Sequence, residues 1–323
     1  MKEIILWQFV QTELEAGNNV VLASVLSHEK GSPGKQGFKM AVSASGKAYG
    51  SIGGGVMEKN LVESIAESFS SKKYLFELRI LHHKAHTQEI KSGLICAGSE
   101  VIYLHTLDSS NDKALVEKIL SSYQKPSDKY LFFKKGKIKI QTRKDFNENY
   151  FFEYSQSGDE WQYYERAGYK NFAYIFGAGH VGFEISKIFY NLDFHISIFD
   201  DRKNFPFLEN NIFANAKYNI PYNKAGKYVK DSNYSYNFIV SAGYVTDKES
   251  LKQIVGKKSK YIGLMGTHNK IKKIFNECVK EGIDRKLLKK VKAPIGIDIN
   301  SDTPEEIAVS IAAEVIKLKN EKT

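Results

Sequence analysis

The residues of this chain that are best placed to do chemistry form a glycine-rich loop, GAGHVG, at positions 177–182. An apolar run expected to be a strand, residues 172–176, precedes the loop, and an amphipathic run expected to be a helix follows it. Asp200 lies 18 residues beyond Gly182, at the end of the next expected strand. This arrangement of glycines and acid is typical of a site for the pyrophosphate and ribose of a dinucleotide.

Each glycine of this loop has its own expected role. Gly177 permits a tight turn, Gly179 lets the backbone approach a pyrophosphate, and Gly182 lets the helix pack on the strand. His180 lies inside the loop, and the N–H groups at the start of the following helix would face the phosphates. Asp200 would accept hydrogen bonds from ribose hydroxyls, which favours NAD over NADP.

The ligand of this expected cleft is open between several candidates. Arg202 lies two residues beyond the acid and weakens the preference for NAD. The same scaffold also occurs with another nucleotide, or with none. The ends of the later expected strands offer polar residues that are not diagnostic of hydride transfer: Ser241, Thr267, His268 and Asn269. An NAD(P)-dependent oxidoreductase is therefore the alternative function.

A second glycine-rich loop, GSIGGG at residues 50–55, precedes an expected helix whose apolar residues repeat every four positions over 57–69. Its three consecutive glycines could expose N–H groups to an anion, with Lys35 and Lys39 supplying charge. Glu58 would repel a phosphate there, but its carboxylate suits the paired N–H donors of an amino-pyrimidinone edge, such as that of a pterin. Two other interpretations stay open: Glu58 complements the helix dipole, and the glycines allow close packing.

The pattern of expected elements divides the chain into three segments. Residues 1–107 mix strands and helices, and residues 108–168 are a β-rich extension and linker. Residues 169–323 alternate strand and helix, which predicts a parallel sheet with helices on both faces. The expected fold class is α/β: an N-terminal α/β domain followed by a Rossmann domain, the fold for which the loop at 177–182 is the fingerprint.

Composition narrows the class of protein. The 323 residues carry a net charge of +10, but only five of the 47 basic residues are arginines, and the lysines are spread along the chain. Readers of nucleic acid rely on arginine for base edges, so we expect no nucleic-acid partner. Two cysteines indicate a reducing compartment, and no apolar run approaches the ~18 residues of a membrane span. Acidic residues early in the N-terminal segment exclude a signal peptide, so we expect a cytoplasmic protein with no membrane partner.

Segments from both halves, in this order, resemble the XdhC/CoxI family, whose members are accessory factors of molybdenum hydroxylases such as xanthine dehydrogenase. GSPGKQGFKMAV (31–42) and GSIGGGVMEKNLVE (50–63) resemble segments of the family's first domain. YIFGAGHVG, IFDDR, SAGYVTD, YIGLMGTHNK and PIGIDINSDTPEEIAVSIAAEV resemble its Rossmann domain. By this resemblance, the site residues of the first half are Ser32, Pro33, Gly37, Lys39, Met40, Gly53, Gly54, Gly55, Glu58 and Cys96.

The resemblance implies a function in handling the molybdenum cofactor, which is of the molybdopterin type. The chain would bind this cofactor as cargo, promote its sulfuration with a cysteine desulfurase and deliver it to a client hydroxylase, acting as a chaperone rather than as a turnover enzyme. The cofactor's phosphate would meet Lys39 and the loop N–H groups, and its pterin edge would meet Glu58. The Rossmann cleft would hold NAD or a related nucleotide, or the nucleotide part of a dinucleotide form of the cofactor. We also expect a homodimer.

The two cysteines have different expected roles. Many family members have a cysteine after the three glycines, but this chain has Val56, so no thiol can act there. Cys96 matches the family's second cysteine segment, and its thiolate would be a soft donor for molybdenum or a carrier of sulfur. Cys96 and Glu58 are thus the candidate reactive groups, with a small buried residue as the other interpretation of Cys96. Cys278 lies on an apolar helical stripe and is expected in the core.

Three histidines, His82, His83 and His86, invite a metal-binding interpretation. Two of them are four residues apart and would share a metal only on a helix. No acid or thiol nearby completes a recognisable ligand set, so we predict no metal site beyond the possible contact of Cys96 with molybdenum.

Overall fold

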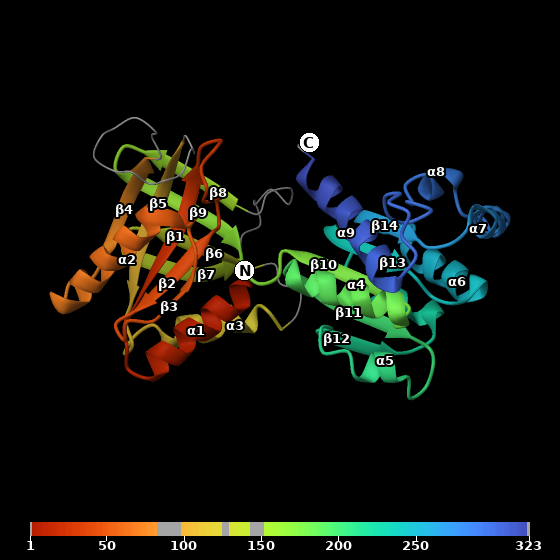
Figure 1. Ribbon diagram of the computed structural model, residues 1–323, viewed down its shortest axis with the longest axis horizontal. Coiled ribbons are helices and arrows are strands. Elements are labelled where there is room, and N and C mark those ends of the chain that lie inside the picture. Colours follow the sequence, from red (N-terminus) through yellow and green to blue (C-terminus); the bar gives the residue numbers. More distant parts are fainter. Residues whose placement is uncertain (1, 83–97, 125–128, 143–151, 322–323) are drawn as a thin grey trace. The chain divides into compact units, whose positions relative to one another are not determined.

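The chain forms two compact units, Met1–Gly168 and Tyr169–Thr323 (Figure 1). The computed structural model describes residues 2–82, 98–124, 129–142 and 152–321. Both units combine helices with sheets, as the expected α/β fold class requires. Residues 108–168 belong to the first unit, to which they contribute a helix and a sheet. None of the helices in the described ranges is long and apolar enough to cross a membrane.

The first sheet of the first unit has the strand order β3-β2-β1-β5-β4, with all neighbours antiparallel. Its strands are β1 (Val20–His28), β2 (Lys39–Ser43), β3 (Ala48–Gly50), β4 (Phe76–His82) and β5 (Ser99–Leu107). Helix α2 (Gly55–Ser70) buries Leu61 and Ile65 in one core with alternate residues of β1 such as Ala23. The four-residue apolar repeat predicted this helix correctly, because residues four apart share one helical face.

A second antiparallel sheet, β7-β6-β9-β8, covers the other face of the first sheet. Its strands are β6 (Lys129–Lys134), β7 (Lys137–Thr142), β8 (Phe152–Ser157) and β9 (Glu160–Arg166). Side chains alternate across a strand, so Tyr103 of β5 points away from the α2 core and meets Trp161 of β9, with 4.6 Å between ring centroids. Helix α1 (Glu3–Glu15) packs against α3 (Lys113–Ser121) and β2.

The second unit is built on a parallel sheet with the strand order β12-β11-β10-β13-β14. The strands are β10 (Asn171–Phe176), β11 (Phe194–Asp200), β12 (Ala216–Asn219), β13 (Ser232–Ile239) and β14 (Ser259–Leu264). The chain moves outward from β10 in one direction and then returns to add β13 on its other side. This reversal creates a crevice at the carboxyl ends of β10 and β13, the place where open α/β sheets bind ligands.

Helices cover this sheet as the alternating pattern predicted. Helices α4 (His180–Asn191) and α9 (Pro304–Asn320) pack together over one face, with Ile175, Phe189 and Ile311 in their shared core (Figure 1). Helix α6 (Tyr244–Ile254) and the 3-10 helix η1 (Tyr222–Tyr228) pack on the other face. Right-handed crossovers that run in opposite directions along a sheet place their helices on opposite faces of it. The remaining helices are α5 (Pro206–Glu209), α7 (His268–Lys280) and α8 (Arg285–Leu288).

Candidate functional site

The loop at 177–182 joins β10 to α4, and its three glycines meet different surroundings. Gly177 has φ +116°, and a Cβ there would lie 2.7 Å from the carbonyl oxygen of Val240. A Cβ on Gly182 would lie 1.9 Å from the carbonyl oxygen of Gly177, so helix and strand approach too closely for any side chain. A Cβ on Gly179 would have no atom within 4 Å. The fold therefore requires Gly177 and Gly182, whereas the space beside Gly179 is open.

This open space belongs to a cavity of about 430 Å³ at the carboxyl ends of β10 and β13. His180 is exposed at the first position of α4, with its ring 4.5 Å from that of Phe207. The cavity combines backbone of the glycine loop, one cation and several apolar side chains, and its lining residues are Gly177, Gly179, His180, Val181, Arg202, Phe205, Phe207, Val240, Ser241, Ala242, Met265 and Pro304. A phosphate ester attached to a flat ring has the chemistry that such a lining accommodates.

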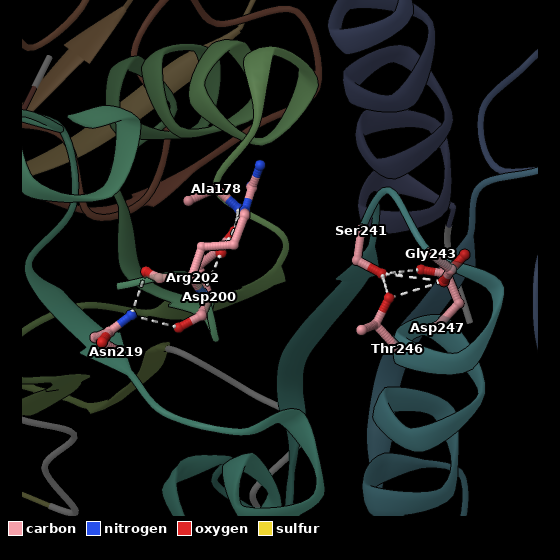
Figure 2. A network of polar contacts seen from close by, with 8 residues as sticks. All are labelled: Ala178, Asp200, Arg202, Asn219, Ser241, Gly243, Thr246 and Asp247. Atoms are coloured by element: carbon pink, nitrogen blue, oxygen red, sulfur yellow. Dashed lines mark hydrogen bonds and ion pairs between the residues drawn. The ribbon is translucent and has the colours of Figure 1, made fainter. Parts of the chain in front are cut away.

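The acid at the end of β11 does not face this cavity as a ribose acceptor. Asp200 is fully buried, and its carboxylate accepts hydrogen bonds from the N–H of Ala178 (2.8 Å) and from the backbone N–H (3.1 Å), Nε (2.8 Å) and Nη2 (2.7 Å) of Arg202 (Figure 2). Burial alone would raise the pKa of Asp200, but the bonds from Arg202 and Ala178 outweigh it and hold the pKa below its usual value. The expected role of Asp200 towards ribose is therefore corrected: its carboxylate is already occupied by this chain.

Arg202 is the charged group that the cavity does present. Its guanidinium lies 3.4 Å from the centre of the Phe205 ring, and the side chain is 47% exposed. Asn219, at the end of β12, donates to the carbonyl oxygens of Asp200 (3.1 Å) and Arg202 (2.6 Å) and so fixes the backbone between them (Figure 2). Asp200 thus fixes the orientation of the exposed Arg202 guanidinium beside the glycine loop.

A second polar cluster lies at the end of β13, on the opposite wall (Figure 2). The Ser241 hydroxyl donates to Oδ1 of Asp247 and lies 2.6 Å from Oγ1 of Thr246. Lys270 of α7 forms an ion pair with Oδ2 of Asp247 (2.5 Å). Burial raises the pKa of Asp247 above its usual value, although Lys270 and Ser241 oppose this shift. The cluster joins the loop after β13 to α6 and α7. The Ser241 hydroxyl is therefore already hydrogen-bonded within the chain, and the residue lines the cavity.

The sequence pattern pointed to Ser241 but to neither Asp247 nor Lys270. Both lie in segments that carried the family resemblance, SAGYVTD and YIGLMGTHNK, which is the signal that could have found them. Their pairing depends on contact between two helices that are separated in sequence, which spacing alone does not give.

In the first unit, the loop at 50–55 is organised by Glu58. Its Oε2 accepts hydrogen bonds from Ser51 Oγ (2.7 Å) and from the N–H groups of Ile52 (2.9 Å) and Gly54 (3.0 Å), while the Gly53 N–H donates to Ser51 Oγ (3.1 Å). Donors that were expected to meet a phosphate are therefore bound by a carboxylate of the same chain. All three bonds to Glu58 end on Oε2, and Gly55 is exposed at the start of α2.

The loop containing Ser32 packs backbone to backbone against the triple glycines. A Cβ on Gly34 would lie 2.1 Å from the carbonyl oxygen of Ile52, and the Gly34 N–H donates to the buried Glu100 carboxylate (2.7 Å). Ser32 is buried and donates to the carbonyl oxygen of Ser99 (2.9 Å), while Pro33 is half-buried. These contacts join the two loops that carried the resemblance in the first unit, and they give Ser32 a role in holding the loop.

The structure corrects the expected role of Lys39. Its Nζ lies 2.7 Å from Oε1 of Glu165 and 2.8 Å from Oε1 of Glu3, and its side chain is 1% exposed. Burial alone would lower the pKa of Lys39, but the two carboxylates outweigh it and the pKa lies above its usual value. Lys39 is a buried cation that joins β2 to β9 and α1, so it is not free to meet a phosphate.

The residues singled out from the sequence also include the two cysteines and the three histidines. Cys96, His83 and His86 lie outside the described residues, so the interpretations of these three stay predictions. His82 ends β4 and is exposed. In the described ranges, no group of three or more His, Cys, Asp or Glu side chains could hold a metal ion. Cys278 is fully buried in α7, as its apolar stripe predicted.

The fold defines a two-unit α/β protein whose second unit has a glycine-rich loop and a cavity at the carboxyl ends of a parallel sheet, and comparison with known families agrees. The model described as the XdhC Rossmann domain matches residues 173–315, and that of the XdhC and CoxI family matches residues 13–78. The chain therefore belongs to the XdhC and CoxI family, as the resemblance predicted.

Two individual proteins give further likeness. The uncharacterized protein YqeB of Escherichia coli K12 is 29% identical over 84 residues, a match that spans 26% of this chain and 16% of that protein. A crystal structure named as a xanthine dehydrogenase from Bacillus halodurans superposes with a TM-score of 0.73 at 19% identity, covering 100% of this chain and 97% of that one. The second likeness shows that the whole fold is shared.

Proposed function

We propose that this chain is an accessory protein of a molybdenum hydroxylase of the xanthine dehydrogenase type. In this proposal it binds the molybdenum cofactor as cargo, assists its sulfuration with a cysteine desulfurase and assists its insertion into the client enzyme. Membership of the XdhC and CoxI family supports an accessory role, and so does the name of the structural neighbour that shares the whole fold.

The observation that carries the proposal is the composition of the cavity in the second unit. The exposed Arg202 guanidinium and the open backbone at Gly179 line this cavity together with apolar side chains, among them the aromatic ring of Phe207. Such a lining suits a phosphate ester that carries a flat heterocycle, which is the chemistry of a nucleotide and of a molybdopterin alike. The cleft would hold a nucleotide, or the nucleotide part of a dinucleotide form of the cofactor.

In the first unit, Glu58 is the candidate contact for the pterin edge. Its Oε2 holds the glycine loop through three hydrogen bonds, which leaves Oε1 as the oxygen to which a pterin N–H would donate. Because the loop orients the carboxylate before any ligand arrives, the ordering cost of binding would be low. Lys39 has no place in this proposal, since its charge is neutralised inside the unit.

The alternative of an NAD(P)-dependent oxidoreductase rested on the Rossmann cleft alone. Asp200, the acid that would accept the ribose hydroxyls of NAD, is fully buried and paired with Arg202. The polar residues at the ends of the later strands are not diagnostic of hydride transfer with either nucleotide. We therefore do not propose it as a second function. A turnover assay that follows NADH or NADPH absorbance with a panel of small alcohols, aldehydes and acids would reopen it if any substrate were consumed.

The experiment that tests the proposal compares cofactor retention in three proteins. The wild type, Glu58→Gln and the control Glu63→Gln are purified from a molybdate-supplied host. Molybdenum is measured by elemental analysis and pterin by fluorescence after oxidation. Glu63 is a fitting control because it lies on the same helix, α2, and is 61% exposed.

We expect molybdenum and pterin in the wild type and in Glu63→Gln, and clearly less of both in Glu58→Gln, which cannot form a charge-assisted pair with the pterin. A wild-type protein that carries neither molybdenum nor pterin contradicts the proposal. Equal retention by all three proteins would show that Glu58 organises its loop but does not contact the pterin.

A further inference from the structure

The cavity proposed to bind a nucleotide contains the salt bridge between Asp200 and Arg202. The geometry of this salt bridge affects which nucleotide can bind. Both carboxylate oxygens of Asp200 already accept hydrogen bonds, Oδ1 from two groups of Arg202 and Oδ2 from Ala178 and Arg202. The side chain has no exposed surface. A ribose hydroxyl would have to displace one of these donors, in particular the charged fork of Arg202, before it could reach the acid.

Arg202 is held in a fixed orientation at the edge of the cavity. Two of its nitrogens, Nε and Nη2, donate to Asp200, and the guanidinium carbon lies 3.4 Å from the centre of the Phe205 ring. Neither bond uses Nη1, and the side chain remains 47% exposed while lining the cavity. Lys203, the next residue, is also exposed. The cleft thus presents a pre-oriented cation at the strand end where a Rossmann fold places the ribose of its ligand.

We propose that Arg202 makes this cleft selective for nucleotides with a phosphate on the 2′ position of the ribose, so that NADP-type ligands bind in preference to NAD-type ligands. The proposal rests on the nucleotide-binding part of the proposed function and names the ligand class of the same site. An arginine fork forms charge-assisted hydrogen bonds with a phosphate dianion but gains little from a neutral hydroxyl. Asp200 does not repel the phosphate strongly, because Arg202 neutralises it at 2.7 Å.

The test is calorimetric titration of the full chain at low salt with NADP+, NAD+, 2′,5′-ADP and 5′-AMP. We expect NADP+ to bind about tenfold or more tightly than NAD+, and 2′,5′-ADP more tightly than 5′-AMP by a similar factor. Raising the salt should weaken the phosphate-dependent part of the affinity, because Arg202 is partly exposed.

Two variants assign the selectivity to the side chain. Arg202→Gln should lose the preference for NADP+ and bind NAD+ at least as well as the wild type, since the Asp200 carboxylate is then released to a ribose hydroxyl. Arg285→Gln makes the same chemical change at an exposed position on α8 and should keep the wild-type ratio. The wild-type ratio needs no variant, so it decides the question even if Arg202→Gln does not fold.

Several outcomes would overturn the inference. Wild-type binding of NAD+ equal to or tighter than that of NADP+ refutes the selectivity while leaving a nucleotide site in place. Equal binding of 2′,5′-ADP and 5′-AMP means that the cleft does not recognise the 2′-phosphate, which refutes the selectivity. An unchanged NADP+ preference in Arg202→Gln removes Arg202 as its cause. Binding of none of the four ligands refutes the nucleotide site itself, and the inference with it.

Discussion

Replacing Lys39 with methionine should destabilise the first unit far more than its single charge suggests. Lys39→Met keeps the apolar stem and removes the ammonium group that lies 2.8 Å from Glu3 and 2.7 Å from Glu165. The two carboxylates then lose the attraction of this ammonium group, and Glu165 has no exposed side-chain surface. Breaking a buried ion pair by removing one partner costs about 3–5 kcal/mol, because the other charge stays desolvated.

This cost is a large fraction of the total stability of an ordinary domain, which is about 5–15 kcal/mol. The pKa of Lys39 lies above its ordinary value, so the ammonium stays charged at neutral and mildly alkaline pH. The stabilisation from this raised pKa is lost only when the pH rises above the ordinary lysine range. The difference between wild type and Lys39→Met should therefore be the same at pH 7 and pH 9.

The two tryptophans of the chain make a selective assay possible. Trp7 and Trp161 both lie in the first unit and both are buried, so their fluorescence during urea unfolding reports on this unit alone. Lys47→Met is the matched control, because Lys47 also pairs with a buried carboxylate, Glu13 (3.2 Å), but is itself 70% exposed. We expect the control to cost less than about 1 kcal/mol.

The double variant Lys39→Met with Glu165→Gln should recover part of the loss, since it removes the buried charge along with its partner. If the free energy of unfolding of Lys39→Met lies within about 1 kcal/mol of the wild type, or if its loss matches that of the exposed control Lys47→Met, the ammonium group is not what offsets the buried carboxylates.

Three further predictions concern acid stability, the glycine loop and the thiols. Burial lowers the pKa of His105 to about 4 from 6.5, so the unfolded chain binds the proton first, and the first unit should lose up to about 3 kcal/mol as the pH falls from about 6.5 to 4. His105→Gln should flatten this slope in urea titrations followed by tryptophan fluorescence, and an unchanged slope would show that other groups cause it. Gly179→Val should keep the wild-type melting temperature and abolish nucleotide binding, whereas Gly182→Ala should lower the melting temperature, because a Cβ has space at Gly179 but not at Gly182. Native protein should lose one thiol to iodoacetamide, at Cys96, while the buried Cys278, whose pKa is raised by burial, stays unreactive; two unreactive thiols before denaturation would restrict Cys96 to packing.

The α/β fold class and the plan of the second unit could be predicted from the sequence. Apolar runs of strand length that alternate with helical repeats specify a parallel sheet, because each helix must bury its apolar face on the sheet beside it. The need for glycine at positions 177 and 182 could also be predicted, since a turn that leads directly into a packed helix leaves no space for a side chain. These are local rules, in which neighbours along the chain decide the outcome.

The partners of the charged side chains were decided only by the tertiary structure. Asp200 and Lys39 were expected to face ligands, yet Arg202 covers the first, while Glu165, 126 residues away in sequence, neutralises the second. Glu58 was expected at the head of α2, but only the folded loop shows that one of its oxygens is committed to Ser51 and the backbone. A charge that folding removes from water must find a partner wherever the fold supplies one, and the type and spacing of residues cannot reveal whether that partner is a ligand or another part of the chain.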